Sequence, residues 1–174
     1  RFADAARERP DLDGGPWTMV ANLPYNVGTP LLLDALAGSP EIERFVVMLQ
    51  REAVERLVAG PGSKAYGLPS VIAALHASAR VAFRVPPTVF LPRPDVDSAV
   101  AVLDRIEPHR CWETAARIAA AGFGQRRKML RRSLVATVPD ATMVLERAGI
   151  DPTRRAEDLA PGYYLSIAEV IDEG

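Results

Sequence analysis

The sequence contains few of the residues that build disulfides or metal sites. Among 174 residues there is one cysteine, Cys111, and there are two histidines, His76 and His109. One cysteine excludes an internal disulfide and fits a reducing compartment. No spacing of Cys, His and Asp is typical of a metal site, so we expect no bound metal.

Long apolar runs are also missing. No stretch of about 18 apolar residues occurs, and the first residues lack the basic-then-apolar order of a secretion signal. We therefore expect a soluble, cytoplasmic protein without a membrane partner. The formal net charge is -1, so any affinity for nucleic acid has to come from a local basic patch.

What the chain does have is enough apolar content, 48%, for one fair-sized core and a smaller second one. Residues 18–22 and 44–49 are short apolar runs, which are typical of strands buried on both faces of a parallel sheet. We expect a helix after the first run, with Thr29 as its cap, Pro30 at its first position and Gly38 as a left-handed stop.

A second helix is expected over residues 51–60, because its apolar residues fall on one face. Residues 68–79 predict another packed helix. The segments 81–85 and 98–106 predict two strands of a hairpin with a wide, proline-rich connection at 86–97. Strands and helices alternate, so the fold class is α/β.

From about residue 108 the pattern becomes helical throughout, over 112–134, 141–150 and 163–172. We therefore divide the chain into a catalytic part at 1–108 and a small helical, RNA-binding part at 109–174.

A candidate site follows the first strand. In open α/β sheets ligands bind beyond the carboxyl ends of strands, where Asn22 to Tyr25 lie. The exocyclic amine of adenine is a poor nucleophile because its lone pair is delocalised, and two acceptors on its N–H groups turn that lone pair outward.

The Asn22 amide offers one acceptor. Pro24 stiffens the turn after Leu23, so a backbone carbonyl can offer the other, and Tyr25 gives a flat face for the base. Such a site acts by orientation and preorganised dipoles.

The NLPY stretch resembles the catalytic motif of the S-adenosylmethionine-dependent adenine amino-methyltransferases. Five blocks in order resemble the ribosomal RNA adenine dimethyltransferase family: NLPYNVGTPLL, MLQREAVERLVAGPGSKAYG, PPTVFLPRPDVDSAV, FGQRRKMLRRSL and GIDPTRRAEDL. The resemblance runs from Val20 to about Leu159. It implies a Rossmann-like methyltransferase sheet followed by a helical domain. It also implies transfer of two methyl groups to each of two adjacent adenosines near the 3′ end of small-subunit ribosomal RNA, in ribosome biogenesis.

The resemblance also assigns roles to residues. Asn22 would hold the target amine and touch the cofactor, while Leu23 and Pro24 shape the backbone acceptor. Tyr25 and Phe90 would stack on the two faces of the flipped base. Two such stacks, at roughly 1–3 kcal/mol each, help to offset the cost of unstacking.

A basic stripe is expected on the helix over 112–134. Its members are Arg126, Arg127, Lys128, Arg131 and Arg132. Crowded cations on a near-neutral protein are typical of a phosphate-binding surface. The resemblance assigns this block to placement on ribosomal RNA, and Arg93 and Lys64 are weaker candidates for further phosphate contacts.

The family builds its cofactor pocket mainly from an N-terminal half whose glycine-rich turn and two acidic residues have no counterpart in this sequence. We therefore expect the C-terminal part of an enzyme, inactive alone and weak in binding S-adenosylmethionine. Its first strand would have an exposed edge, which favours self-association or modest stability.

Simpler readings remain for each feature. A tetrapeptide turn after a strand is more often structural than catalytic, and a basic stripe alone is more often a solvated face. Two rival functions are a non-catalytic RNA-binding assembly factor and an adenine methyltransferase acting on large-subunit ribosomal RNA or DNA. Methyl transfer separates the first rival from the family function, and substrate choice separates the second.

Overall fold

A computed structural model describes residues 15–173, which form two compact units. The first unit comprises residues 15–58 and 76–107, and the second comprises 59–75 and 108–173. The sequence division at 108/109 differs from this in one respect, because residues 59–75 group with the helical unit.

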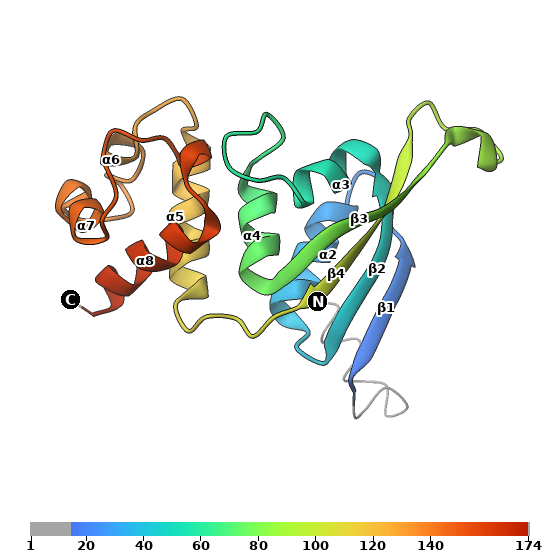
Figure 1. The fold of residues 1–174 in the computed structure, drawn as a ribbon, viewed down its shortest axis with the longest axis horizontal. Helices are drawn as coiled ribbons and strands as arrows, with labels where there is room; N and C mark the ends of the chain where they lie inside the picture. The colour runs from blue at the N-terminus through green and yellow to red at the C-terminus, as the bar shows by residue number, and fades with distance from the viewer. Residues whose placement is uncertain (1–14, 174) are drawn as a thin grey trace. The chain divides into compact units, whose positions relative to one another are not determined.

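The first unit is built on a four-stranded sheet. Its strands are β1 (Trp17–Asn22), β2 (Ile42–Gln50), β3 (Ala77–Val85) and β4 (Ser98–Arg105). The strand order is β1-β2-β4-β3, with β1 parallel to β2 and the other neighbours antiparallel (Figure 1). The expected parallel pair and the expected hairpin are both present, and the α/β class is confirmed.

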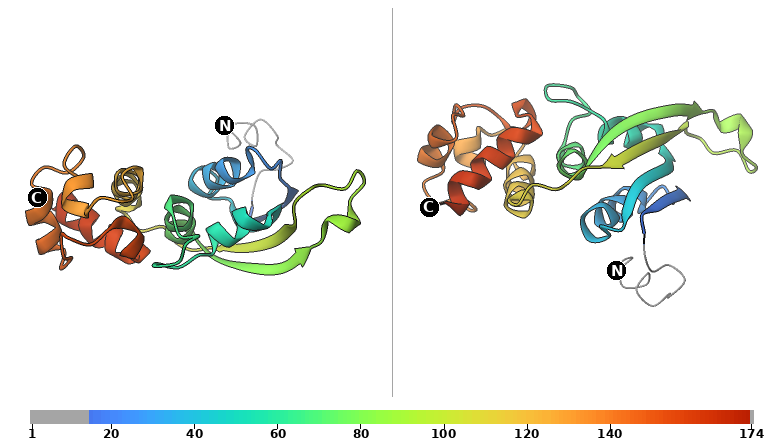
Figure 2. Two further views of the ribbon diagram at one scale, coloured as in Figure 1. Left: turned by 90° about the horizontal axis from the view of Figure 1, so that it is seen from above. Right: turned by 60° about the horizontal axis from the view of Figure 1, so that its bottom comes forward.

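Helices α2 (Gly28–Gly38) and α3 (Arg51–Leu57) lie over one face of this sheet (Figure 2). On that face Phe45, Val47 and Leu49 of β2 are at most 1% exposed. The residues between them in the strand are only half-buried. Alternate burial of this kind indicates a sheet with one well-covered face.

The start of α2 differs from the expected capping by Thr29. The helix begins at Gly28, and the Pro24 carbonyl accepts the N–H groups of Val27 and Gly28 at 3.3 and 2.7 Å. A Cβ at Gly28 would lie 2.4 Å from Cδ2 of Leu49 and 2.9 Å from Cβ of Leu23, which is fixed to the backbone, so the turn favours glycine here. Gly38 is also not a left-handed stop, because it is the last residue of the helix and its φ is not positive.

The prediction that β1 is buried on both faces is wrong. Its residues alternate between half-buried and exposed, and Val20 is 76% exposed. The reason is its place in the sheet, since β1 pairs only with β2 in the described part of the chain. A short apolar run does not by itself distinguish an edge strand from a central one.

Arg105 at the end of β4 holds the connection between α2 and β2. Its guanidinium donates to the carbonyls of Leu36, Ser39 and Ile42 at 2.7, 2.8 and 2.6 Å. It also lies 5.6 Å from the centre of the Phe45 ring. One cation therefore satisfies carbonyls at the end of a helix, where intrahelical donors run out.

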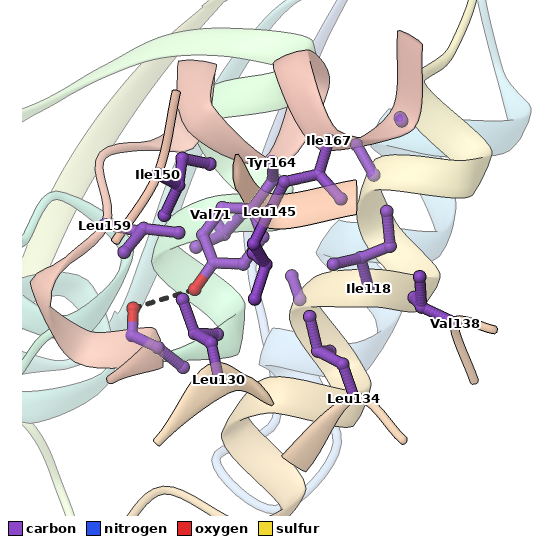
Figure 3. Close-up of a cluster of buried hydrophobic side chains, with 14 of the residues drawn as sticks. Val71, Ile118, Leu130, Leu134, Val138, Leu145, Ile150, Leu159, Tyr164 and Ile167 are labelled. Atoms are coloured by element: carbon purple, nitrogen blue, oxygen red, sulfur yellow. Dashed lines mark hydrogen bonds between the residues drawn. The ribbon is translucent and has the colours of Figure 1, made fainter. Parts of the chain in front are cut away.

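The second unit is helical. Its main elements are α4 (Leu68–His76), α5 (Trp112–Gly124), α6 (Leu130–Ser133), α7 (Ala141–Arg147) and α8 (Pro161–Asp172). They enclose a core whose members include Val71, Ile118, Leu145 and Ile167, all at most 1% exposed (Figure 3). Tyr66 and Tyr164 are buried in the same core. None of the helices between residues 15 and 173 has the length and apolar character that crossing a membrane requires.

Two expected helices end earlier than their patterns indicate. The helix expected over 68–79 stops at His76, because Ala77 to Ala79 pair with β4 as the start of β3. The helix expected over 112–134 stops at Gly124, and a turn separates it from the short α6. The basic residues therefore lie on a turn and a short helix instead of one long helical face.

Candidate active site

The residues proposed to carry catalysis lie together in the first unit. Asn22, Leu23, Pro24 and Tyr25 at the carboxyl end of β1 line a pocket of about 410 Å³. Phe90, Pro92 and Pro94, from the loop between β3 and β4, line the same pocket. The pocket is therefore built from two segments that are distant in sequence.

Backbone contacts hold the NLPY turn against the sheet. The Leu23 N–H donates to the Met48 carbonyl at 3.1 Å, and the Leu23 side chain is 4% exposed. The Pro24 carbonyl accepts the first N–H groups of α2. Asn22 is exposed at the pocket. The turn thus buries leucine as an anchor and presents the amide outward.

Tyr25 is oriented by a residue that the sequence reasoning missed. Its hydroxyl lies 2.8 Å from Oγ of Ser98, and Ser98 is fully buried at the start of β4. This hydrogen bond fixes the tip of the ring, while the residue as a whole remains 39% exposed. A flat face held in one orientation suits stacking on a base.

The loop that carries Phe90 is fastened at its end by Asp97. The Arg51 N–H donates to the Asp97 carbonyl at 2.9 Å, and the Arg51 guanidinium donates to the Asp97 carboxylate, also at 2.9 Å. Near Phe90 the chain makes a short 3₁₀ turn over Pro87–Val89. Asp97 and Ser98 are adjacent, so two neighbouring residues hold the end of the Phe90 loop and the Tyr25 ring.

No charged side chain lines this pocket. Its polar groups are the Asn22 amide and backbone atoms, which suit a neutral base with N–H donors. For S-adenosylmethionine, the cofactor that the family resemblance implies, the fit is partial. Asn22 can contact such a molecule, but the pocket lining offers no carboxylate for ribose hydroxyls.

The basic residues lie in the second unit, and they are not equivalent. Arg126 pairs with the Glu157 carboxylate at 2.5 Å, so its charge is already compensated. Arg127, Lys128, Arg131 and Arg132 are exposed. The loop of Lys64 approaches the same region, because the Gly62 N–H donates to the Glu157 carbonyl at 2.9 Å. Arg93 is exposed on the loop of the first unit that carries Phe90.

Tyr66 is a core residue of the helical unit. Its hydroxyl donates to the Leu159 carbonyl at 2.7 Å, and its ring packs edge-on against Phe123 with centroids 5.8 Å apart. Burial raises the pKa of Tyr66 to about 12, so the hydroxyl remains a donor at neutral pH. The GSKAYG block thereby fastens residues 59–75 to the helices.

Comparison with known proteins identifies the family. A family model described as ribosomal RNA adenine dimethylase matches residues 7–173. The chain belongs to this family. A ribosomal RNA small subunit methyltransferase A from Azorhizobium caulinodans is 47% identical over 168 residues, which are 94% of this chain and 58% of that protein. The protein of the same name from Rhodospirillum rubrum is 46% identical, over 92% of this chain and 57% of its own length.

The chain spans little more than half the length of those relatives. Solved structures agree on the fold. A dimethyladenosine transferase from Plasmodium falciparum superposes with a TM-score of 0.78 at 20% identity, covering 90% of this chain and 66% of that chain. The 23S rRNA methyltransferase ErmE superposes with a TM-score of 0.65 at 20% identity, covering 99% and 78%. The expected Rossmann-like fold is confirmed.

Proposed function

We propose that this chain forms the base-binding part of an enzyme that dimethylates two adjacent adenosines of small-subunit ribosomal RNA during ribosome biogenesis in the cytoplasm. The observation that carries this proposal is the pocket that the NLPY turn and Phe90 line together. The family match over residues 7–173 supports the same reaction.

In the proposed reaction the protein orients the amine of a flipped adenine. The Asn22 amide oxygen accepts one N–H. The Pro24 carbonyl is engaged by α2, so the Leu23 carbonyl is the backbone acceptor that we propose for the second N–H. With both protons held, the nitrogen lone pair is turned out of the ring system and can accept a methyl group. S-adenosylmethionine supplies the electrophilic methyl group when it is bound.

Stacking on the aromatic side chains offsets the free energy needed to extract the base from its stack. Tyr25, held by Ser98, and Phe90 line the same pocket, and we propose that they stack on the two faces of the base. Base–aromatic stacking contributes roughly 1–3 kcal/mol per ring, which is comparable with the cost of unstacking. The pocket therefore selects a planar base without a charged group.

We propose that RNA phosphates bind the exposed cations of the second unit, Arg127, Lys128, Arg131 and Arg132. Lys64 and Arg93 are weaker candidates for the same role. Arg126 is the least suited of the original set, because a phosphate would have to displace Glu157.

The test is methyl transfer to purified small ribosomal subunits that lack the modification, with radiolabelled S-adenosylmethionine. Two proteins are compared: this chain, and a chimera in which it replaces the matching part of the Azorhizobium caulinodans relative. Labelled dimethyladenosine formed by the chimera is the expected result. Failure of a chimera that binds the cofactor normally would overturn the proposal and favour the assembly-factor alternative.

The site is tested in the chimera by Asn22→Ala, with Asn26→Ala as the matched control. Asn26 is an exposed asparagine four residues further on that does not line the pocket. We expect Asn22→Ala to abolish transfer with little change in RNA affinity, because it removes an acceptor needed only at the reacting amine. Equal activity of the two variants would contradict the proposed role of Asn22.

A further inference from the structure

The hairpin of β3 and β4 carries an exposed surface, which contains none of the basic residues of the second unit. Residues 77–94 contain three arginines, Arg80, Arg84 and Arg93, and no aspartate or glutamate. The same stretch exposes Phe83 by 59% and Leu91 completely. We call Arg80, Phe83, Arg84 and Arg93 the hairpin surface.

Register places two members of this surface side by side. Arg80 is opposite Val102 and Phe83 is opposite Val100, which are two residues apart on β4 and so share a face. Arg80 and Phe83 are three residues apart and would normally point to opposite faces. The irregularity between Val81 and Phe83 inserts one residue and brings them to the same face. An exposed arginine therefore lies beside an exposed aromatic ring.

Arg84 is opposite Ala99, next to Val100 on β4, so it lies on the other face of the edge strand β3, near Glu55 of α3. Its side chain is 73% exposed, and the carboxylate of Glu55 lies 4.0 Å away, at the outer limit of an ion pair. Glu55 is also approached by Arg51 at 3.6 Å. The charge of Arg84 is thus only weakly compensated, and an exposed pair of this kind contributes little.

The combination favours RNA over a protein as the occupant. Three arginines without any carboxylate between residues 77 and 94 suit a polyanion, and the exposed Phe83 ring suits its bases. Stacking on an aromatic face with phosphates held by arginine is the usual mode for single-stranded nucleic acid. β3 is an edge of the described sheet, and the hairpin loop extends beyond its other strands (Figures 1 and 2). That loop also carries Phe90, which lines the base pocket.

We propose that the hairpin surface binds the RNA strand that delivers an adenine to the pocket of Asn22, Tyr25 and Phe90. Arg80 and Arg84 contact phosphates, and Phe83 stacks on a base next to the one that enters the pocket. That this strand belongs to small-subunit ribosomal RNA rests on the proposed function. The contact between RNA and the hairpin surface is tested separately, by measuring RNA binding.

The experiment measures binding of this chain to a short fluorescein-labelled single-stranded RNA with two adjacent adenosines, by anisotropy over a range of salt concentrations. The double variant Arg80→Gln/Arg84→Gln should bind more weakly. The slope of log K against log salt should fall by roughly 1.4, because each single-strand phosphate contact contributes about 0.7. Arg80→Lys/Arg84→Lys should retain most of the slope, since both charges remain. Arg147→Gln, at an exposed arginine of α7, is the matched control.

Two substitutions of Phe83 distinguish stacking on a base from apolar contact. Phe83→Ala should reduce affinity about tenfold, within the range of one lost base stack, and Phe83→Leu should not restore it. Restored affinity in Phe83→Leu would overturn the stacking role. Sedimentation velocity on the same variants tests the other occupant, since a dimer that Phe83→Ala dissociates at unchanged RNA affinity would assign this face to a second copy.

The two proposals fail in different ways. An unchanged slope in the arginine double variant, with weaker binding after charge reversal at Arg127 and Lys128, would overturn the hairpin surface and leave the proposed function standing. Absence of RNA binding by the unaltered chain would overturn the hairpin surface directly. The proposed function would then still be tested by methyl transfer in the chimera.

Discussion

At the scale of single residues, the hydrogen bond between Tyr25 and Ser98 links the two halves of the base pocket. Its partners differ in environment, because Ser98 is fully buried whereas Tyr25 is 39% exposed. Removing the tyrosine hydroxyl leaves a buried group without its partner. Removing the serine hydroxyl leaves a phenol that water can reach.

We therefore expect Tyr25→Phe to lower the free energy of unfolding more than Ser98→Ala does, by about 1–3 kcal/mol against about 1 kcal/mol. The double variant should cost less than the sum, with a coupling of about 1 kcal/mol. Urea unfolding of the four proteins measures this cycle. Strictly additive losses would mean that the contact contributes nothing to stability.

The sequence predicts part of this site and misses the rest for a physical reason. Asn22 to Tyr25 are contiguous, so their shared position at a strand end follows from local pattern. Phe90 was assigned by resemblance to a family. Ser98 gives no local signal, because it opens an apolar strand and its partner is 73 residues away in sequence.

At the scale of secondary-structure elements, Arg105 joins α2 to β2 through the carbonyls of Leu36, Ser39 and Ile42. Arg105→Lys should lower the free energy of unfolding by about 3 kcal/mol, because an ammonium cannot reach three carbonyls with the geometry of a guanidinium. The control is Arg44→Lys, at an exposed pair with Asp104, where a loss below about 1 kcal/mol is expected. Equal losses in thermal or urea unfolding would contradict this role.

Element boundaries were predicted less well than the elements themselves. The pattern over 112–134 is helical, yet the chain leaves the helix after Gly124. The Leu130 and Arg131 N–H groups instead donate to the carbonyls of Arg154 and Pro152. These partners lie in a distant turn, so periodicity within the segment cannot reveal them. Likewise, pairing with β4 draws Ala77 to Ala79 out of the expected helix and into β3.

At the scale of the whole molecule, the exposed edge of β1 remains the main prediction for behaviour in solution. Within residues 15–173 its outer edge pairs with no strand, and Val20 is 76% exposed. We expect concentration-dependent self-association of this chain, because an unpaired edge is a template for another strand. Val20→Lys should weaken it and Val89→Lys, at a similarly exposed loop valine, should not. Sedimentation velocity measures both, and a monomer at all concentrations would contradict the prediction.

The two units alternate along the sequence, and this determines which segments can be expressed separately. Residues 59–75 contribute Tyr66, Val71 and Leu75 to the core of the helical unit, although the rest of that unit begins only at residue 108. A contiguous clone of 108–174 would encode helices without the tyrosine whose hydroxyl binds Leu159. Grafting the helical unit onto another enzyme therefore requires two inserted pieces, or a permuted gene that joins 59–75 directly to 108–174.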